Sequence, residues 1–80
     1  MNNQNQKAFE TLKNLGYPLH RIRQALLQLN GASHQAIAKE AGVSRASVSQ
    51  HIAGLRTNDR LLKQIADYLG VVKEDFFPEL

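Results

Sequence analysis

Two short helical segments that meet at Gly42-Val43-Ser44 limit most strongly how this chain can fold. Ser33 and Ser44 stand where each segment begins, and a serine hydroxyl at such a position can accept a hydrogen bond from an unpaired backbone N–H. Gly42 follows the first segment and can adopt the left-handed conformation that ends a helix, and Gly54 is placed to end the second. The sequence therefore predicts two helices of about two turns each, joined by a tight turn.

Apolar residues four positions apart give both segments an inward face. The expected inward residues are Ile37, Ala41, Val48 and Ile52. Ala38 is expected where the two helices cross, because a bulkier side chain there would push them apart. Val43 is expected to be an apolar plug inside the turn. These positions all favour the same helix-turn-helix arrangement, and such agreement is stronger evidence than any one residue.

The outward face of the second segment is suited to contacts with DNA bases. It carries Arg45, Ala46, Ser47, Ser49 and Gln50. Arginine can bind guanine and glutamine can bind adenine with two hydrogen bonds each, and an alanine methyl can contact thymine. An ordinary exposed helix would carry more Glu and Lys, which have better helix propensity than serine. We therefore predict that these five residues read base edges; a polar helix without a role in DNA binding is the alternative.

The stretch from Leu19 onward resembles the lambda-repressor-like (XRE-type) helix-turn-helix superfamily. The resemblance rests on Ser33, Ile37-Ala38, Ala41-Gly42-Val43-Ser44-Arg45, Ser47-Val48-Ser49, Gly54, Leu61-Leu62-Lys63, Ile65-Ala66 and Leu69-Gly70-Val71. A narrower resemblance to the small Ner-like phage regulators rests on His20-Arg21, Ile22, Ala25-Leu26, Arg60, Leu69-Gly70-Val71 and Asp75-Phe76-Phe77-Pro78. It implies an all-α, compact bundle of about five helices containing a helix-turn-helix.

The implied function is that of a sequence-specific regulator of transcription, a phage or prophage-type repressor that binds double-stranded DNA in the major groove. A homodimer on a near-palindromic site is expected, because one copy would read only a short half-site. The expected contacts with DNA phosphates are Ser33, His34, Gln35, Ser44, Arg56, Thr57 and Asn58. Two residues depart from the family pattern. His34 replaces a common glutamine, and His51 replaces a branched aliphatic residue and is expected at the surface or near DNA.

Helical periodicity also marks the rest of the chain. An additional N-terminal helix over residues 5–16 has the apolar stripe Phe9, Leu12 and Leu15, after residues 1–4, which are expected to be disordered. A second helix is expected over the apolar stripe Leu19, Ile22, Leu26 and Leu29, with Asn30-Gly31 as its end. A fifth helix is expected from Asn58 or Asp59 to Leu69, with Gly70 as its end, and a short helical turn from Lys73 to Phe77.

Two apolar features leave alternatives open. The N-terminal helix can pack on the core or serve as a dimerisation arm, and one apolar stripe is needed merely to attach it, which favours packing. Of Phe76 and Phe77, we expect one to be buried against the fifth helix, while the other could be left for a partner subunit.

Length, composition and charge are consistent with one small intracellular domain. The chain has 80 residues, a formal net charge of +3 and no cysteine, so disulfides are excluded. It has no apolar run long enough for a membrane span, and its polar start is unlike a signal peptide, which predicts a cytoplasmic protein. A basic middle precedes an acidic end, which would orient the molecule on a polyanion. The basic residues are Arg45, Arg56, Arg60 and Lys63; the acidic ones are Asp67, Glu74, Asp75 and Glu79.

Other classes of function lack the residues they need. His20, His34 and His51 do not share a helix face at i, i+4 spacing, so no metal site, cofactor or zinc set is predicted. No Gly-x-Ser-x-Gly elbow or glycine-rich phosphate loop is present, so we do not predict an enzyme. Val48-Ser49-Gln50-His51-Ile52 suggests a metal-sensing winged helix, but no β-hairpin pattern follows. No effector domain is expected, and therefore no small-molecule effector.

Two alternatives to a repressor remain at this level. One is a DNA-binding accessory factor in recombination or transposition, which would use the same helix at different sites. The other is a protein-interaction module of the antitoxin-like kind, which would bind a partner chain stably and DNA weakly.

Overall fold

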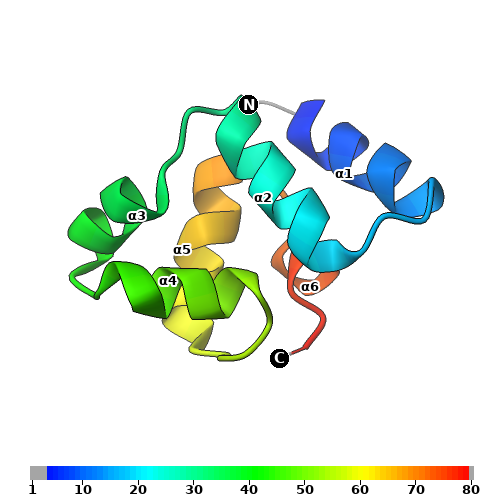
Figure 1. Cartoon of the computed structure of the whole chain (residues 1–80). Coiled ribbons are helices and arrows are strands. Elements are labelled where there is room, and N and C mark those ends of the chain that lie inside the picture. Colours follow the sequence, from blue (N-terminus) through cyan, green and yellow to red (C-terminus); the bar gives the residue numbers. More distant parts are fainter. Residues whose placement is uncertain (1–3, 80) are drawn as a thin grey trace.

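Six helices follow one another along residues 4–79, the part of the chain that this computed structural model describes. They are α1 (Gln4–Asn14), α2 (Leu19–Leu29), α3 (His34–Ala41), α4 (Arg45–Ile52), α5 (Asp59–Leu69) and α6 (Lys73–Phe76) (Figure 1). No strand occurs within residues 4–79, so the predicted all-α class is confirmed. Gln4, which we expected to be disordered, is the first residue of α1, while the same expectation for residues 1–3 lies outside the described residues.

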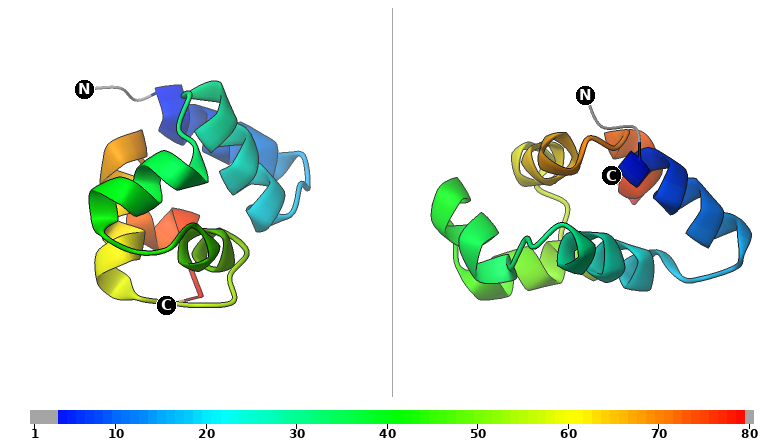
Figure 2. Two further views of the ribbon diagram at one scale, coloured as in Figure 1. Left: turned by 60° about the vertical axis from the view of Figure 1, so that its left-hand side comes forward. Right: turned by 90° about the horizontal axis from the view of Figure 1, so that it is seen from above.

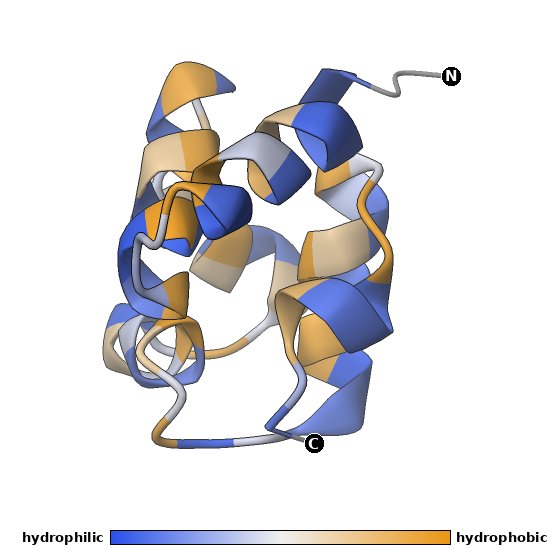
Figure 3. Cartoon of the chain, turned by 90° about the vertical axis from the view of Figure 1, so that its right-hand side faces the viewer, coloured by the Kyte–Doolittle hydropathy of each residue, from blue (hydrophilic) through white to orange (hydrophobic). Residues whose placement is uncertain are grey.

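The helices are arranged so that α3 and α1 lie at opposite ends of the molecule, with α2 and α5 between them (Figures 1 and 2). The molecule measures 32 × 25 × 17 Å along its principal axes. The helix α4 crosses near the N-terminal end of α5, and α3 packs most closely on α4. Hydrophobic and hydrophilic stretches alternate along the helices (Figure 3), which is the pattern expected when each helix has one face on a shared core.

Three aromatic rings form one part of this core. The rings of Phe9 and Phe76 meet edge to face with centroids 5.5 Å apart, and those of Phe76 and Phe77 do so at 5.0 Å. The remaining buried apolar residues are Ile22, Leu26, Leu27, Ala32, Ala38, Val48, Ile52, Leu61, Leu62, Ile65, Ala66, Leu69 and Val71. The core therefore draws on all six helices and both ends of the described chain.

The N-terminal helix packs against this core and bonds to the ends of two other helices. Besides the buried Phe9, Asn5 donates from Nδ2 to the carbonyl of Leu69 at 2.8 Å. The Gln6 Oε1 atom accepts from the backbone N–H of Val72 at 2.9 Å. Both bonds satisfy backbone groups at helix ends, where no intrahelical partner exists. The helix α1 thus stabilises the junction between α5 and α6.

Two apolar residues do not lie where the periodicity placed them. Leu15 is 69% exposed and Leu29 is 77% exposed, because Leu15 lies beyond the last residue of α1 and Leu29 is the last residue of α2. In α2 the neighbouring Leu27 is buried instead. The expectation that one of Phe76 and Phe77 is left for a partner is also wrong, since both are buried; Phe77 packs on the guanidinium of Arg23.

Candidate nucleic-acid interface

The turn between α3 and α4 has the geometry that its residues predict. Ser33 Oγ accepts from the N–H of Ala36 at 3.0 Å, and Ser44 Oγ accepts from the N–H of Ser47 at 3.0 Å. Gly42 ends α3 with φ 72° and ψ 31°, in the left-handed region. These local bonds fix where each helix begins and ends, so the two predicted serine caps and the glycine stop are confirmed.

Replacing Ser44 by alanine should lower the free energy of unfolding by about 0.5–2 kcal/mol, because the first turn of α4 loses its cap. Ser44→Asp keeps a side-chain acceptor at the same position and should retain most of the wild-type stability. Urea denaturation of the three proteins measures the difference. Equal stability of Ser44→Ala and wild type would contradict a stabilising role of this cap.

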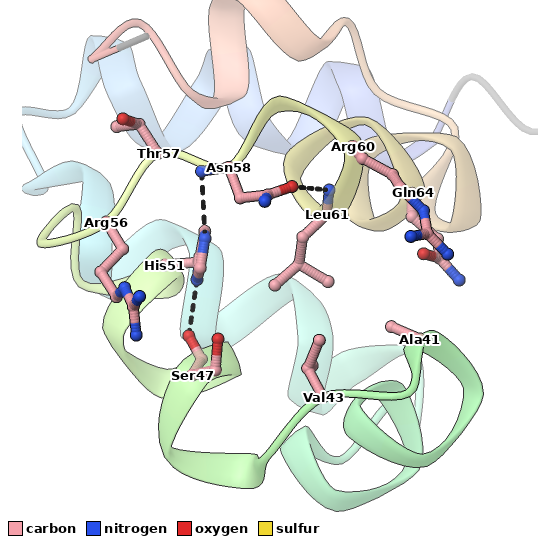
Figure 4. A pocket seen from close by; sticks show the side chains of 10 residues that line it. All are labelled: Ala41, Val43, Ser47, His51, Arg56, Thr57, Asn58, Arg60, Leu61 and Gln64. Atoms are coloured by element: carbon pink, nitrogen blue, oxygen red, sulfur yellow. Dashed lines mark hydrogen bonds between the residues drawn. The ribbon is translucent and has the colours of Figure 1, made fainter.

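The inner faces of α3 and α4 meet as predicted, except in the turn itself. Ala38 is 5% exposed, and Val48 and Ile52 are both fully buried. Val43 is 39% exposed and is therefore no plug inside the turn. The left-handed Gly42 redirects the chain, and the Val43 side chain lies at the edge of an open hollow instead (Figure 4).

The outer face of α4 divides into an exposed and a half-buried part. Arg45, Ala46 and Gln50 are exposed, whereas Ser47 and Ser49 are half-buried. The Ser49 hydroxyl lies 2.8 Å from His34 Nδ1 on α3, so this pair holds the two helices together. The structure thus brings the five predicted base-reading residues onto one helix, but only three of them are exposed.

Both helices of the motif begin without an acidic residue in the first turn. Their free N–H groups and helix dipoles therefore leave positive potential at Ser33 and Ser44, and such helix ends favour phosphate groups. Gln35 is exposed beside the first end, and His34 is half-buried beside it. These residues remain predicted phosphate contacts.

His34 has a pKa below the ordinary value of 6.5, first because the ring is partly buried and second because the Arg45 cation lies near it. The ring is therefore mainly neutral at pH 7. A negative phosphate beside the ring would oppose both effects and favour the protonated form.

The second candidate phosphate region is the connection after α4. Arg56 and Thr57 are exposed, and Arg56 donates from Nη1 to Gln50 Oε1 at 3.3 Å. Asn58 Oδ1 accepts from the N–H of Leu61 at 3.1 Å and so begins α5. This cap uses the oxygen of Asn58, so its predicted contact with a phosphate would have to come from Nδ2.

His51, expected at the surface or near DNA, is 3% exposed, so that expectation is wrong. Its Nδ1 lies 2.6 Å from the carbonyl of Ser47, and its Nε2 accepts from the N–H of Asn58 at 3.1 Å (Figure 4). The proton therefore lies on Nδ1. His51 replaces an inward-facing aliphatic residue and joins α4 to the connection that carries Arg56. The sequence signal for this burial was the family pattern, which has an aliphatic residue at the position of His51.

An open hollow of about 510 Å³ lies between α4, the turn and the beginning of α5 (Figure 4). It is lined by Ala41, Val43, Ser47, His51, Arg56, Thr57, Asn58, Arg60, Leu61 and Gln64, none of which is acidic. Arg56 and Arg60 face it from opposite sides (Figure 4). Arg60 was not among the predicted contacts, although the basic middle of the sequence contains it.

The charges of the described residues leave this side of the molecule basic. Several acidic residues from α5 onward are paired: Asp59 with Lys73 at 2.6 Å, Asp67 with Lys63 at 2.9 Å, and Glu79 with Arg23 at 2.5 Å. Asp75 forms no salt bridge within residues 4–79. Arg45, Arg56 and Arg60 form no salt bridge with any residue in the range 4–79. Three unpaired cations around α4 form an attractive surface for a polyanion.

The profile of a helix-turn-helix family matches residues 22–77, more than half of the chain. The chain belongs to the XRE-type, lambda-repressor-like helix-turn-helix family. It is therefore a DNA-binding regulator of the XRE type, and α4 occupies the place of the recognition helix. No curated protein and no solved structure gives a significant match.

The family is a DNA-binding regulatory one and generally non-enzymatic. The match begins within α2, so α1 lies outside it. Among residues 4–79, no helix has the length and apolar character needed to cross a membrane. The same residues contain no group of three or more His, Asp or Glu side chains that could hold a metal ion.

Proposed function

We propose that this XRE-type protein recognises a specific DNA sequence through the outer face of α4 and represses transcription by covering a promoter. The observation that carries the proposal is the acid-free face of α4, flanked by two helix N-termini that also lack acids. Arg45 and Gln50 would read base edges by hydrogen bonds, and Ala46 would contact a thymine methyl. Ser47 and Ser49 would contribute where their hydroxyls reach the groove.

Phosphate contacts would set the register of α4 on the duplex. We assign them to Ser33, His34, Gln35, Ser44, Arg56, Thr57 and Asn58, which lie at the starts of α3 and α4 and in the connection to α5. Contacts of this kind position a protein without reading sequence. Arg60, on the far side of the hollow from Arg56, extends the same basic surface.

The proposed regulator is of the phage or prophage type, similar to the small Ner-like proteins, and acts as a homodimer. A dimer would bind two half-sites whose centres are about 34–36 Å apart, one turn of the duplex. Inserting about five base pairs between the half-sites turns them to opposite faces and should abolish tight binding, whereas about ten should restore part of it. Equal binding to all three spacings, measured by gel shift, would contradict the dimer.

Repression is tested by transcription in vitro from two templates. In the first, the preferred duplex overlaps the promoter, and in the second the same duplex lies well upstream. We expect the protein to silence only the first template. If the protein binds tightly but silences both templates or neither template, occlusion of the promoter is contradicted. Protection of a recombination end would instead indicate an accessory factor.

Binding should strengthen as the pH falls through the range below 6.5. Free His34 has a lowered pKa, and a bound phosphate would raise it, so the complex takes up a proton in this window. The stability of the free protein should change in the opposite direction. Because the lowered pKa of His34 lets the unfolded state bind the proton more readily than the folded state, the free energy of unfolding falls as the pH drops below 6.5. Affinity measured from pH 7.5 to 5.5 tests the prediction. His34→Gln should remove this pH dependence, and an unchanged pH profile in that variant would contradict the phosphate contact.

A further inference from the structure

Arg23 on α2 is 0% exposed and joins three parts of the chain that are far apart in sequence. Its Nε donates to the carbonyl of Phe76 at 2.8 Å, and its Nη1 donates to the carbonyl of Ile52 at 2.9 Å. Its Nη2 contacts the carboxylate of Glu79. One guanidinium thus connects α2, the end of α4 and the segment after α6.

The surroundings of Arg23 are built to hold a buried cation. The Phe77 ring lies 4.7 Å from the guanidinium carbon, a distance that suits a cation–π contact. Gly54, which follows α4 at φ 80°, leaves room for the Glu79 carboxylate, because a Cβ there would lie 2.8 Å from Glu79 Oε2. The side chain of Glu79 is 34% exposed, so the ion pair reaches the surface only on that side.

The bond from Arg23 to Ile52 acts on the recognition helix itself. Ile52 is the last residue of α4, and the last carbonyls of a helix have no intrahelical partner. A positive charge at this end is also favoured by the helix dipole. Buried ion pairs often add little stability compared with apolar residues of similar volume. The planar guanidinium nevertheless holds its N–H donors at fixed angles, so it restricts the directions in which its acceptors can lie.

We propose that Arg23 is a positioning residue for DNA recognition: it fixes the C-terminal end of α4 and so sets the angle at which Arg45 and Gln50 meet the bases. The proposal rests on the proposed function of α4. An α4 of 8 residues is about 12 Å long at 1.5 Å per residue. A tilt of about 10° moves one end by about 2 Å, which exceeds the tolerance of a base-reading hydrogen bond.

The test compares affinity for the preferred duplex with affinity for a scrambled duplex of the same length and at the same salt, well below the unfolding midpoint of each variant. Arg23→Met fills much of the space and leaves the carbonyls of Ile52 and Phe76 unpaired. We expect it to lower specific affinity about tenfold and affinity for the scrambled duplex less than about twofold. Glu79→Gln keeps Arg23 but gives it a neutral partner. We expect the ratio of specific to scrambled affinity to fall about threefold in this variant.

Leu69→Ala is the control for lost stability. Leu69 is 1% exposed at the opposite end of α5 from Asn58, so this variant loses core packing but keeps every group that bonds to Arg23. Its ratio of specific to scrambled affinity should equal that of wild type. An unchanged ratio in Arg23→Met, or an equal fall in Leu69→Ala, would overturn the proposal. If Arg23→Met does not fold, the ratio of specific to scrambled affinity in Glu79→Gln tests the proposal, and an unchanged ratio there would overturn it.

Failure of the proposed function looks different from failure of this inference. A wild-type protein that does not distinguish the two duplexes contradicts sequence-specific reading by α4 and removes the basis of the inference. A wild-type protein that distinguishes them, together with an Arg23→Met variant that distinguishes them equally well, contradicts the inference alone.

Discussion

Phe76→Ala should lower the free energy of unfolding by about 3–5 kcal/mol, the largest loss that we expect from a single substitution. The Phe76 ring is fully buried and meets two other rings edge to face, Phe9 at 5.5 Å and Phe77 at 5.0 Å. Its removal leaves a cavity where α1, α5 and α6 meet, in addition to the lost transfer energy. A loss of this size is a large part of the stability of a small domain.

Urea denaturation at constant pH measures the effect on Phe76. Tyr68→Ala is the matched control, because Tyr68 is an aromatic residue of α5 that is 57% exposed. It should change the free energy of unfolding by less than about 0.5 kcal/mol, as surface substitutions usually do. Similar losses in both variants would contradict the aromatic core centred on Phe76.

Arg45→Ala should weaken binding to the preferred duplex by about 1–3 kcal/mol and relax the preference at one base pair. Arg45 is the first residue of α4, is exposed and forms no salt bridge within residues 4–79. Its guanidinium is therefore free to bind a guanine edge with two hydrogen bonds. Affinities for the preferred duplex and its single-base variants give both quantities.

Arg21→Ala is the charge-matched control for Arg45→Ala. Arg21 is exposed on α2, in a groove that Leu12 and Tyr17 of the N-terminal part also line. Its loss should weaken binding slightly and by the same factor on every sequence, because only long-range attraction changes. If Arg45→Ala also weakens binding equally on all sequences, Arg45 contacts the backbone and reads no base.

The local features of the fold could be predicted from sequence because short-range bonds determine them. Ser33 and Ser44 cap their helices through a hydroxyl and an N–H three residues later, and Gly42 adopts the left-handed conformation at the end of α3. Each of these depends on a few neighbouring residues. The inward positions Val48 and Ile52 also follow from helical periodicity alone.

Burial that depends on distant segments could not be predicted in this way. Leu29 continues an apolar stripe but, as the last residue of α2, is 77% exposed, while Leu26 and Leu27 of the same helix are buried. Arg23 looks like a surface residue of an amphipathic helix, yet its partners lie 29 to 56 positions away. His51 is buried because Ser47 and Asn58 supply an acceptor and a donor on either side of the ring.

The candidate site shows the same division. Periodicity placed Arg45, Ala46 and Gln50 on the outer face of α4, and these three are exposed. It could not show that Ser49 bonds to His34 across the two helices, or that Arg60 faces the hollow opposite Arg56. Both depend on how α3, α4 and α5 pack, which a one-dimensional pattern does not specify.

The central claim, that the outer face of α4 reads a specific sequence, is tested most directly by selecting bound duplexes from a random pool and titrating the preferred duplex against salt. We predict one enriched, two-fold symmetric motif and an affinity that falls steeply with salt, with a slope of about −0.9 per phosphate contact. Absence of an enriched motif, with only weak, salt-sensitive binding to every duplex, would contradict the claim.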